Sequence, residues 1–367
     1  MGTSPPILAH PAGGDGTPGR APSSLARALV TCAIAAEEAF AGARVRCAMG
    51  FDISFHPLPW DVLTERVYPY VLGEAPSDAL DPLVSDAVRI AKVRFRANAW
   101  GLGVLRLRDA APAAFDPDLH VWGRPFFVTA EGTEAIADTI DRDLAARPED
   151  VDAIAREQLE QLQPGLASRV EPSDEGTLPS DADLAASVRG HVDLMRASVA
   201  AIRGGRGSIE FGGRAHDPAR LLGRELALTA LTFAADFRPG WMARGKLWPS
   251  LLLVELGVNV RDRIIANAAM FMPVYRALPD VPWFLAETIY ENYQVGGAAS
   301  PGDLPALRAL LMENRERILA PARAHGEHAY VATVLRKIDE AMADAQHRGL
   351  PFCEATEVYS GFSGIMN

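Results

Sequence analysis

Hydrophobic and polar residues alternate most regularly in residues 49–57, Met-Gly-Phe-Asp-Ile-Ser-Phe-His-Pro. Successive side chains of a strand point to opposite faces, so this alternation predicts a strand with one apolar face and one polar face. The apolar face holds Phe51, Ile53 and Phe55, and the polar face holds Asp52, Ser54 and His56. We expect the folded body of the chain to be organised around this core strand.

The pattern in residues 1–48 is different. Residues 1–23 are rich in Gly, Pro and Ser, which predicts disorder, and the Ala-rich residues 24–41 are compatible with a helix. Two interpretations remain open: a flexible leader with an accessory helix, or a start of translation at Met49 with an upstream segment that is not part of the protein. We favour the second, because the strand pattern starts directly after Met49.

Residues 49–163 combine strand and helix patterns. Apolar residues recur at helical spacing from Trp60 until Pro69 interrupts them, and a second helix is predicted from Ser77 to Gly101. Two acidic helices end this part of the chain. Two further strands are predicted, at residues 102–108 and 119–128. We expect these elements to form an α+β subdomain.

Residues 164–182, rich in Pro, Gly and Ser, predict a linker or long loop and a subdomain boundary. Residues 183–367 are expected to form a mainly helical subdomain. Its predicted helices cover residues 181–203, 217–237, 247–260, 303–319 and 327–345. The chain is therefore predicted to be a helix-rich α+β protein, with a small β-sheet in the first part packed on helices and a mainly helical second part.

Composition and charge narrow the class of protein. Of the 367 residues, 49% are hydrophobic and 23% are charged, as in ordinary globular proteins. The net charge is −11, and residues 131–183 carry 15 acidic residues against 4 arginines, which is also −11. The rest of the chain is close to neutral. This balance argues against nucleic acid as a general partner.

Cysteine usage and hydropathy predict the compartment. The three cysteines form no C-x-x-C pair, which argues against a cysteine-based zinc site and favours a reducing compartment. No run of 18 apolar residues is present, so neither a membrane-spanning helix nor a membrane partner is expected. We expect a cytoplasmic protein.

The polar face of the 49–57 strand carries the first candidate site. His56 is a candidate general acid or base, and Asp52 is a candidate group to orient it. Neighbours on one strand face are about 6.5–7 Å apart, which is too far for a relay within the strand. His56 therefore needs a partner from another segment. The alternative is that these residues form the solvent face of a strand or a buried hydrogen-bond network.

His120, Trp122 and Arg124 form the second candidate site, on one face of the predicted 119–128 strand. A Trp beside an Arg suits a small planar or anionic ligand, through stacking and paired hydrogen bonds. The alternative is that Trp122 belongs to the core and Arg124 caps a sheet edge. If the two strands pair, His56 and His120 meet in one pocket.

The other polar clusters favour structural roles. One helix face carries the basic residues Arg89, Lys92 and Arg96, which are expected either to dock on the acidic segment 131–183 or to be solvated. His191 lies on an apolar stripe and is expected to be packed, while Arg224 and Glu225 are expected in a buried ionic network. No metal site is predicted, and the glycine patterns indicate no particular cofactor.

Two classes of function remain. The first is a small-molecule-binding or anion-binding protein, or an enzyme, with a His/Asp/Arg pocket between sheet and helices. The second is a non-catalytic interaction protein of an immunity or regulatory type, which binds a protein partner through the acidic 131–183 segment and the aromatic, basic 237–249 loop.

Overall fold

The computed structural model describes residues 51–107, 115–130, 132–173, 176–258, 268–284 and 286–358. The predictions for residues 1–48 and for Met49 lie outside these ranges. Within them the protein is a helix-rich α+β protein, as its sequence predicts. No helix in the described ranges has the length and apolar run that crossing a bilayer requires.

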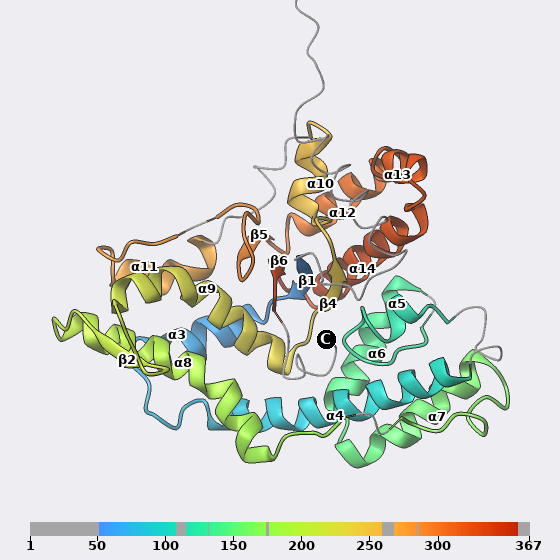
Figure 1. Ribbon diagram of the computed structural model, residues 1–367, viewed down its shortest axis with the longest axis horizontal. Helices are drawn as coiled ribbons and strands as arrows, with labels where there is room; N and C mark the ends of the chain where they lie inside the picture. Colours follow the sequence, from blue (N-terminus) through green and yellow to red (C-terminus); the bar gives the residue numbers. More distant parts are fainter. Residues whose placement is uncertain are drawn as a thin grey trace, which may run out of the picture. The chain divides into compact units, whose positions relative to one another are not determined.

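A four-stranded antiparallel sheet lies among the helices (Figure 1). Its strands, in spatial order, are β4 Trp241–Arg244, β1 Asp52–Pro57, β6 Phe352–Thr356 and β5 Val295–Ala299. The predicted 49–57 strand is therefore confirmed as β1, an interior strand with two neighbours. Phe55 pairs with Trp241 on one side and with Glu354 on the other. The three other strands come from the second half of the chain.

Fifteen helical segments surround this sheet in the described ranges, and β2 Ile209–Phe211 and β3 Arg214–His216 form a separate hairpin. The segments are α2 Trp60–Val62, η1 Leu63–Val67, α3 Tyr68–Val71, α4 Asp81–Arg106, α5 Pro117–His120, α6 Thr133–Ala145, η3 Pro148–Asp150, α7 Val151–Leu162, α8 Asp181–Arg203, α9 Pro218–Phe237, α10 Pro249–Glu255, α11 Ala268–Ala277, α12 Leu304–Glu313, α13 Arg315–Ala324 and α14 His328–His347. The long helices α8, α9 and α14 match their predicted positions.

Both faces of β1 are buried. Ile53 and Phe55 pack in one core cluster together with residues of β4 and α14. The expected polar face is buried as well, because Ser54 and His56 are 0% and 2% exposed. This face belongs to the side of the sheet where Cys353 of β6 packs with α9 in a second core cluster. A strand covered on both sides explains why only Asp52, at its start, keeps contact with solvent.

The predicted strand at 102–108 is wrong, because α4 continues to Arg106. Gly101 does not end the helix. A Cβ atom on Gly101 would lie 3.2 Å from a methyl carbon of Val121, and one on Gly103 would overlap the backbone of Glu171. Both glycines are therefore required because other segments of the chain pack closely against α4. Gly101 was predicted to end the helix, because glycine often follows the last turn of a helix.

The predicted strand at 119–128 is also wrong, because residues 117–120 form the short helix α5. The Asp116 side chain accepts a hydrogen bond from the backbone N–H of Asp118 at 3.1 Å, and Pro117 occupies the first helical turn. Asp followed by Pro is a strong helix start, and it outweighs the alternation that follows it.

Two other predicted helices have different limits. Pro69 does not stop its helix, because the π-helical turn η1 precedes it and Pro69 lies in the first turn of α3, where a missing N–H is tolerated. The 303–319 helix is interrupted at Asn314, whose side chain donates to the carbonyl oxygen of Leu310 at 2.8 Å. It is therefore two helices, α12 and α13.

The segment 164–182 packs on the first part of the chain where the structure describes it. Leu166 and Val170 are buried, and the backbone N–H of Ser173 donates to the carbonyl oxygen of Ala99 at 2.8 Å. The subdomain boundary expected in this segment stays a prediction.

The glycines of two helices provide a test of this packing. Gly103→Ala is expected to lower the free energy of unfolding by roughly 1–3 kcal/mol, because the new methyl group overlaps the backbone of Glu171. Gly190→Ala in α8 is the matched control, since no atom lies within 4 Å of its Cβ position. It is expected to raise the same quantity by roughly 0.5–1 kcal/mol. Urea unfolding measures both, and equal effects would contradict the described packing of α4.

Candidate functional site

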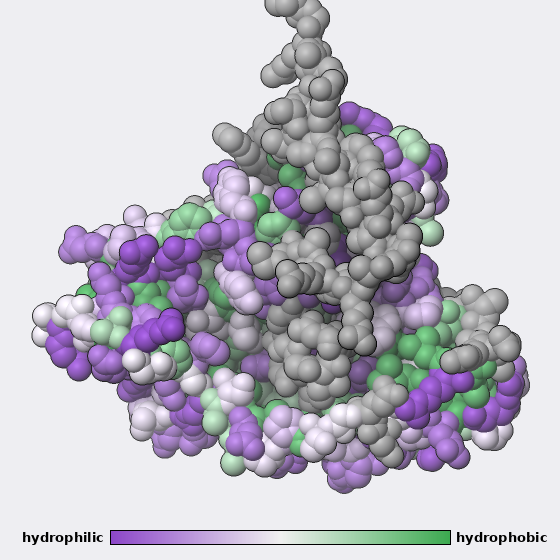
Figure 2. Space-filling model, viewed as in Figure 1, coloured by the Kyte–Doolittle hydropathy of each residue, from purple (hydrophilic) through white to green (hydrophobic). Residues whose placement is uncertain are grey.

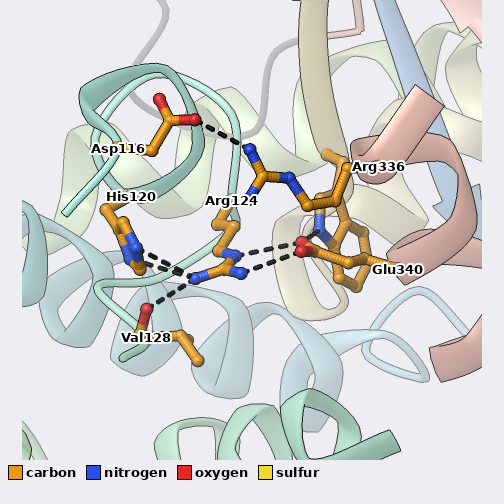
Figure 3. A network of polar contacts seen from close by, with 7 residues as sticks. Asp116, His120, Arg124, Val128, Arg336 and Glu340 are labelled. Carbon is orange, nitrogen blue, oxygen red and sulfur yellow. Dashed lines mark hydrogen bonds and ion pairs between the residues drawn. The ribbon is translucent and has the colours of Figure 1, made fainter. Parts of the chain in front are cut away.

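Arg124 and Glu340 form a buried ion pair at the centre of a polar network (Figure 3). Arg124 Nε donates to Glu340 Oε2 at 3.0 Å, and Arg124 Nη2 donates to Glu340 Oε1 at 2.8 Å. Arg124 Nη1 donates to the carbonyl oxygen of Val128, and Trp241 Nε1 donates to Glu340 Oε2. The guanidinium expected to bind an anionic ligand is therefore bound by a carboxylate of the chain itself.

His120 belongs to the same network. Its Nδ1 lies 3.0 Å from Arg124 Nη1, and its ring stacks on Phe115 with 4.8 Å between centroids. Burial, and then the charge of Arg124, lower the pKa of His120 to about 3. The imidazole is therefore neutral and can accept from the guanidinium. Trp122, the third residue of this predicted site, lies outside the network and is 41% exposed.

His56 and Asp52 lie at opposite ends of β1, roughly 13 Å apart along the strand. The carboxylate of Asp52 lies 3.1 Å from Arg244 Nε. The ring of His56 is buried beside Gly240, and neither of its nitrogens has a hydrogen-bond partner among the described residues. Burial, and then the charge of Arg94, lower its pKa to about 3. The structure does not bring Asp52 to His56, and a catalytic role for either residue stays a prediction.

His56 and His120 were expected to meet only if their strands paired. The two segments do not pair, because β1 pairs with β4 and β6, and His120 lies in a helix. The predicted docking of the basic helix face is confirmed. Lys92 forms an ion pair with Asp181 and Arg96 with Asp152, while Arg89 donates to the carbonyl oxygens of residues 144 and 146.

A second buried carboxylate, Glu354 of β6, joins α10 to the sheet. It accepts hydrogen bonds from the hydroxyl and the backbone N–H of Ser250, and from the backbone N–H of Gly297. The Ser250 hydroxyl also lies 2.7 Å from that of Thr288. Burial raises the pKa of Glu354 to about 7 in spite of these donors. Because its oxygens are bound within the chain, we interpret this cluster as structural.

The described part of the chain contains a cleft of about 610 Å³ between α8, α9, residues 284–295 and the end of β6. Its lining residues are Ser187, Val188, His191, Val192, Arg224, Glu225, Ala227, Leu228, Thr229, Thr232, Phe233, Asp236, Phe284, Glu291, Asn292, Tyr293, Gln294, Val295 and Glu357. The pocket expected between sheet and helices was placed around His56 and Arg124, and this cleft lies elsewhere, beside Val295 of β5. It is lined by none of the five predicted site residues.

A polar stripe of α9 faces this cleft. It consists of Glu225, Thr229, Thr232 and Asp236. Steps of four, three and four residues keep these side chains on one helix face. Most of the remaining residues of α9 are apolar, and the exceptions are the exposed Arg220 and Arg224. The stripe is visible in the sequence, where the helix was interpreted as apolar nearly all round. Polar residues at helical spacing were the signal that was missed.

Two strained residues also line the cleft. Tyr293 and Glu357, each with φ of 58°, are the non-glycine residues with positive φ in the described ranges. Such conformations cost energy and persist where surrounding contacts enforce them. Gln294 supplies such contacts, because its Oε1 accepts from the backbone N–H groups of residues 290 and 291, and its N–H donates to Thr356 Oγ1. The strain is therefore located at the cleft.

Arg224 and Glu225 were expected in a buried ionic network, but they line the cleft. Arg224 is half-exposed and pairs with Glu291 across the cleft at 3.0 Å. Glu225 lines the cleft beside it, and His191, expected to be packed, is exposed on α8. The prediction that these three residues are buried is wrong, because α8 and α9 stand at the open side of the second core cluster. No group of three metal-ligating side chains lies close together in the described ranges.

The buried ion pair can be tested by a double-mutant cycle. Arg124→Leu and Glu340→Leu are each expected to cost roughly 3–5 kcal/mol of unfolding free energy, because each leaves an unpaired buried charge. The double variant should cost less than the sum of both. Arg142→Leu and Glu157→Leu, in an exposed pair, are the control and should couple by less than about 1 kcal/mol. Additive effects at residues 124 and 340 would contradict the buried pair.

The pKa of His56 predicts a pH-dependent stability. A histidine with a lowered folded-state pKa stabilises the fold above about pH 6.5, and this contribution is lost as the pH falls toward 3. Between pH 7.5 and pH 5.0, His56→Leu is therefore expected to gain about 2 kcal/mol relative to the original protein. Urea unfolding at both pH values measures this difference. Parallel pH dependence of the two proteins would show that His56 is protonated when folded.

The cleft between α8, α9 and residues 284–295 has to be interpreted from its own side chains. The chain matches no protein-family model, no curated protein and no solved structure.

Proposed function

We propose that this protein binds a small polar organic molecule in the cleft between α8, α9 and residues 284–295, as a ligand-binding protein or as an enzyme that acts on that molecule. The observation that carries this proposal is the polar stripe of α9, which faces a cleft of about 610 Å³. Ligand sites of proteins occupy clefts of roughly 300–1,000 Å³, with an apolar lining and a few polar groups that orient the ligand.

The energetic cost of the stripe supports a ligand. Polar side chains on a helix that packs in a core are unfavourable unless hydrogen bonds satisfy them. Thr229 is 7% exposed, and yet it lies on the side of α9 that faces an open cleft. A ligand with several hydrogen-bonding groups can bond to the hydroxyl groups of this stripe in place of water. Backbone strain at Tyr293 and Glu357 supports the same conclusion, because strain concentrates at functional sites.

The charge of the cleft changes the expected ligand. A small anionic or planar ligand was predicted from Arg124, which the structure places in an internal ion pair. The cleft itself carries four carboxylates against the single guanidinium of Arg224. A carboxylate or phosphate would be repelled by this lining. We therefore propose a ligand that is rich in hydrogen-bond donors.

The alternative, an interaction protein, has less support. Asp152 and Asp181 of the acidic segment are used in ion pairs within the chain. Trp241 and Trp248 of the 237–249 segment are buried, so a partner cannot reach their rings. Figure 2 shows hydrophilic and hydrophobic residues side by side over α6 and α7, and nothing in the described chain identifies a partner for that surface.

A cytoplasmic location is part of this proposal. It is supported by the free thiol of Cys353, which is fully buried in the second core cluster, and by the absence of any C-x-x-C pair from the sequence. A protein that folds around a buried thiol is compatible with a reducing compartment.

The two threonines of the stripe provide the test. A thermal-shift screen of polar metabolites is expected to find compounds that raise the unfolding temperature, because they bind the folded state. The double variant Thr229→Val with Thr232→Val keeps the shape of the cleft and removes two hydroxyl groups. Affinity for such a compound should fall at least tenfold, since each lost hydrogen bond contributes about 1 kcal/mol.

Thr139→Val is the matched control, because Thr139 lies partly exposed on α6, outside the cleft lining, and bonds to its own helix. It should leave the affinity unchanged. A screen with no hit, or hits whose affinity is unchanged in the double variant, would contradict the proposed binding cleft.

A further inference from the structure

We infer that the ligand of this cleft is an organic cation, a molecule with a primary amine or guanidine group, and that Glu225 binds the charged group beside the rings of Phe284 and Tyr293. The inference rests on the proposed function, because it names the chemical class that the same cleft would take.

The charges at this end of the cleft are unequal. Arg224 is neutralised by Glu291, with 3.0 Å between Nη2 and Oε1. Glu225, the next residue of α9, forms no ion pair with any residue of the described chain. Asp236, at the other end of the stripe, faces the buried charge of Arg94. The carboxylate that lacks a positive partner is therefore at the end of α9 where Arg224 and Glu291 meet.

Two aromatic rings lie at this same end. The backbone N–H of Phe284 donates to the carbonyl oxygen of Gly223 at 3.1 Å, which places Phe284 next to the turn of α9 that carries Glu225. Tyr293 is two residues from Glu291, and both line the cleft. The rings of Phe284 and Tyr293 are 44% and 67% exposed. Exposed rings in the same cleft as a carboxylate without an ion pair are the groups that proteins use to bind organic cations.

An unsatisfied acceptor supports the same class of ligand. The side-chain oxygen of Asn292 is buried and has no hydrogen-bond partner among the described residues, and Asn292 lines the cleft between Glu291 and Tyr293. Buried polar atoms without a partner are rare in folded proteins. An ammonium or guanidinium group has donors only, and both an acceptor without a partner and a carboxylate require donors.

Three four-carbon compounds that differ in charge can test this inference: 1,4-diaminobutane, 1,4-butanediol and succinate. Calorimetric titration of the full chain at low and equal ionic strength is expected to show binding of the diamine at least tenfold tighter than that of the diol, and no binding of succinate. Salt should weaken the diamine complex, because the attraction is partly screened.

Glu225→Gln keeps the shape of the side chain and removes its charge. It is expected to weaken diamine binding about tenfold. Glu210→Gln on β2 is the matched control, because Glu210 is exposed and lies outside the cleft lining. Phe284→Leu, which removes the ring and retains an apolar side chain, is expected to weaken diamine binding as well.

The outcomes separate this inference from the proposed function. Binding of succinate, equal binding of the diol and the diamine, or no effect of Glu225→Gln would overturn the cationic ligand. The same holds if none of the three compounds binds. The proposed function survives those results if the metabolite screen yields a compound whose affinity depends on Thr229 and Thr232, and it fails with the inference if no such compound exists.

Discussion

The buried ion pair between Arg124 and Glu340 is the interaction on which the arrangement of the sheet and its helices depends. The side chains are 4% and 2% exposed, so each charge relies on the other and on the hydrogen bonds around it. Glu340 stands on α14, which packs against β1, β4 and β6, and it also accepts from Trp241 of β4. Arg124 holds the irregular segment after α5 against this helix. One pair thus joins three segments that are far apart in the sequence.

The other face of the sheet is subject to a different constraint, because it buries polar atoms that have no hydrogen-bond partner in the described chain. The Ser54 hydroxyl, both ring nitrogens of His56 and the Tyr68 hydroxyl are buried and unpaired within the described chain. Keeping them there requires neutral groups, and burial lowers the pKa of His56 accordingly. This face is covered by α9 and its neighbours, which fixes one side of α9 against the core. The opposite side of α9 is thereby left to line the cleft.

Sequence reasoning succeeded where the signal is local. The alternation of β1 and the Asp217-Pro218 start of α9 each lie within a few residues of the element they specify. It failed for β5 and β6, because Val-Gly-Gly-Ala-Ala has no alternation of apolar and polar residues, and β6 carries a charged residue, Glu354, into the core. β6 forms a strand because it pairs with β1 and β5, and β5 forms a strand because it pairs with β6. Pairing between distant segments cannot be seen in a local sequence pattern.

The candidate site shows the same limit. A pocket between sheet and helices was predicted, but His120 and Arg124 were selected because they alternate, and their alternation belongs to a helix start and a turn. The stripe from Glu225 to Asp236 could have been found, since its spacing is helical. The strain at Tyr293 and Glu357 could not, because positive φ at a non-glycine residue leaves no trace in a single sequence.

The first strand is connected to the cleft through Glu357. The backbone N–H of Glu357 donates to the carbonyl oxygen of Asp52 at 2.8 Å, and the Asp52 N–H lies 3.5 Å from Glu357 Oε1. Asp52 was predicted as a site residue because of its carboxylate, but the contact with the cleft is made by its backbone. This backbone binds Glu357, which lines the cleft and whose positive φ costs of order 1–3 kcal/mol. A ligand that contacts Glu357 would therefore contact a residue that is hydrogen-bonded directly to the first residue of β1.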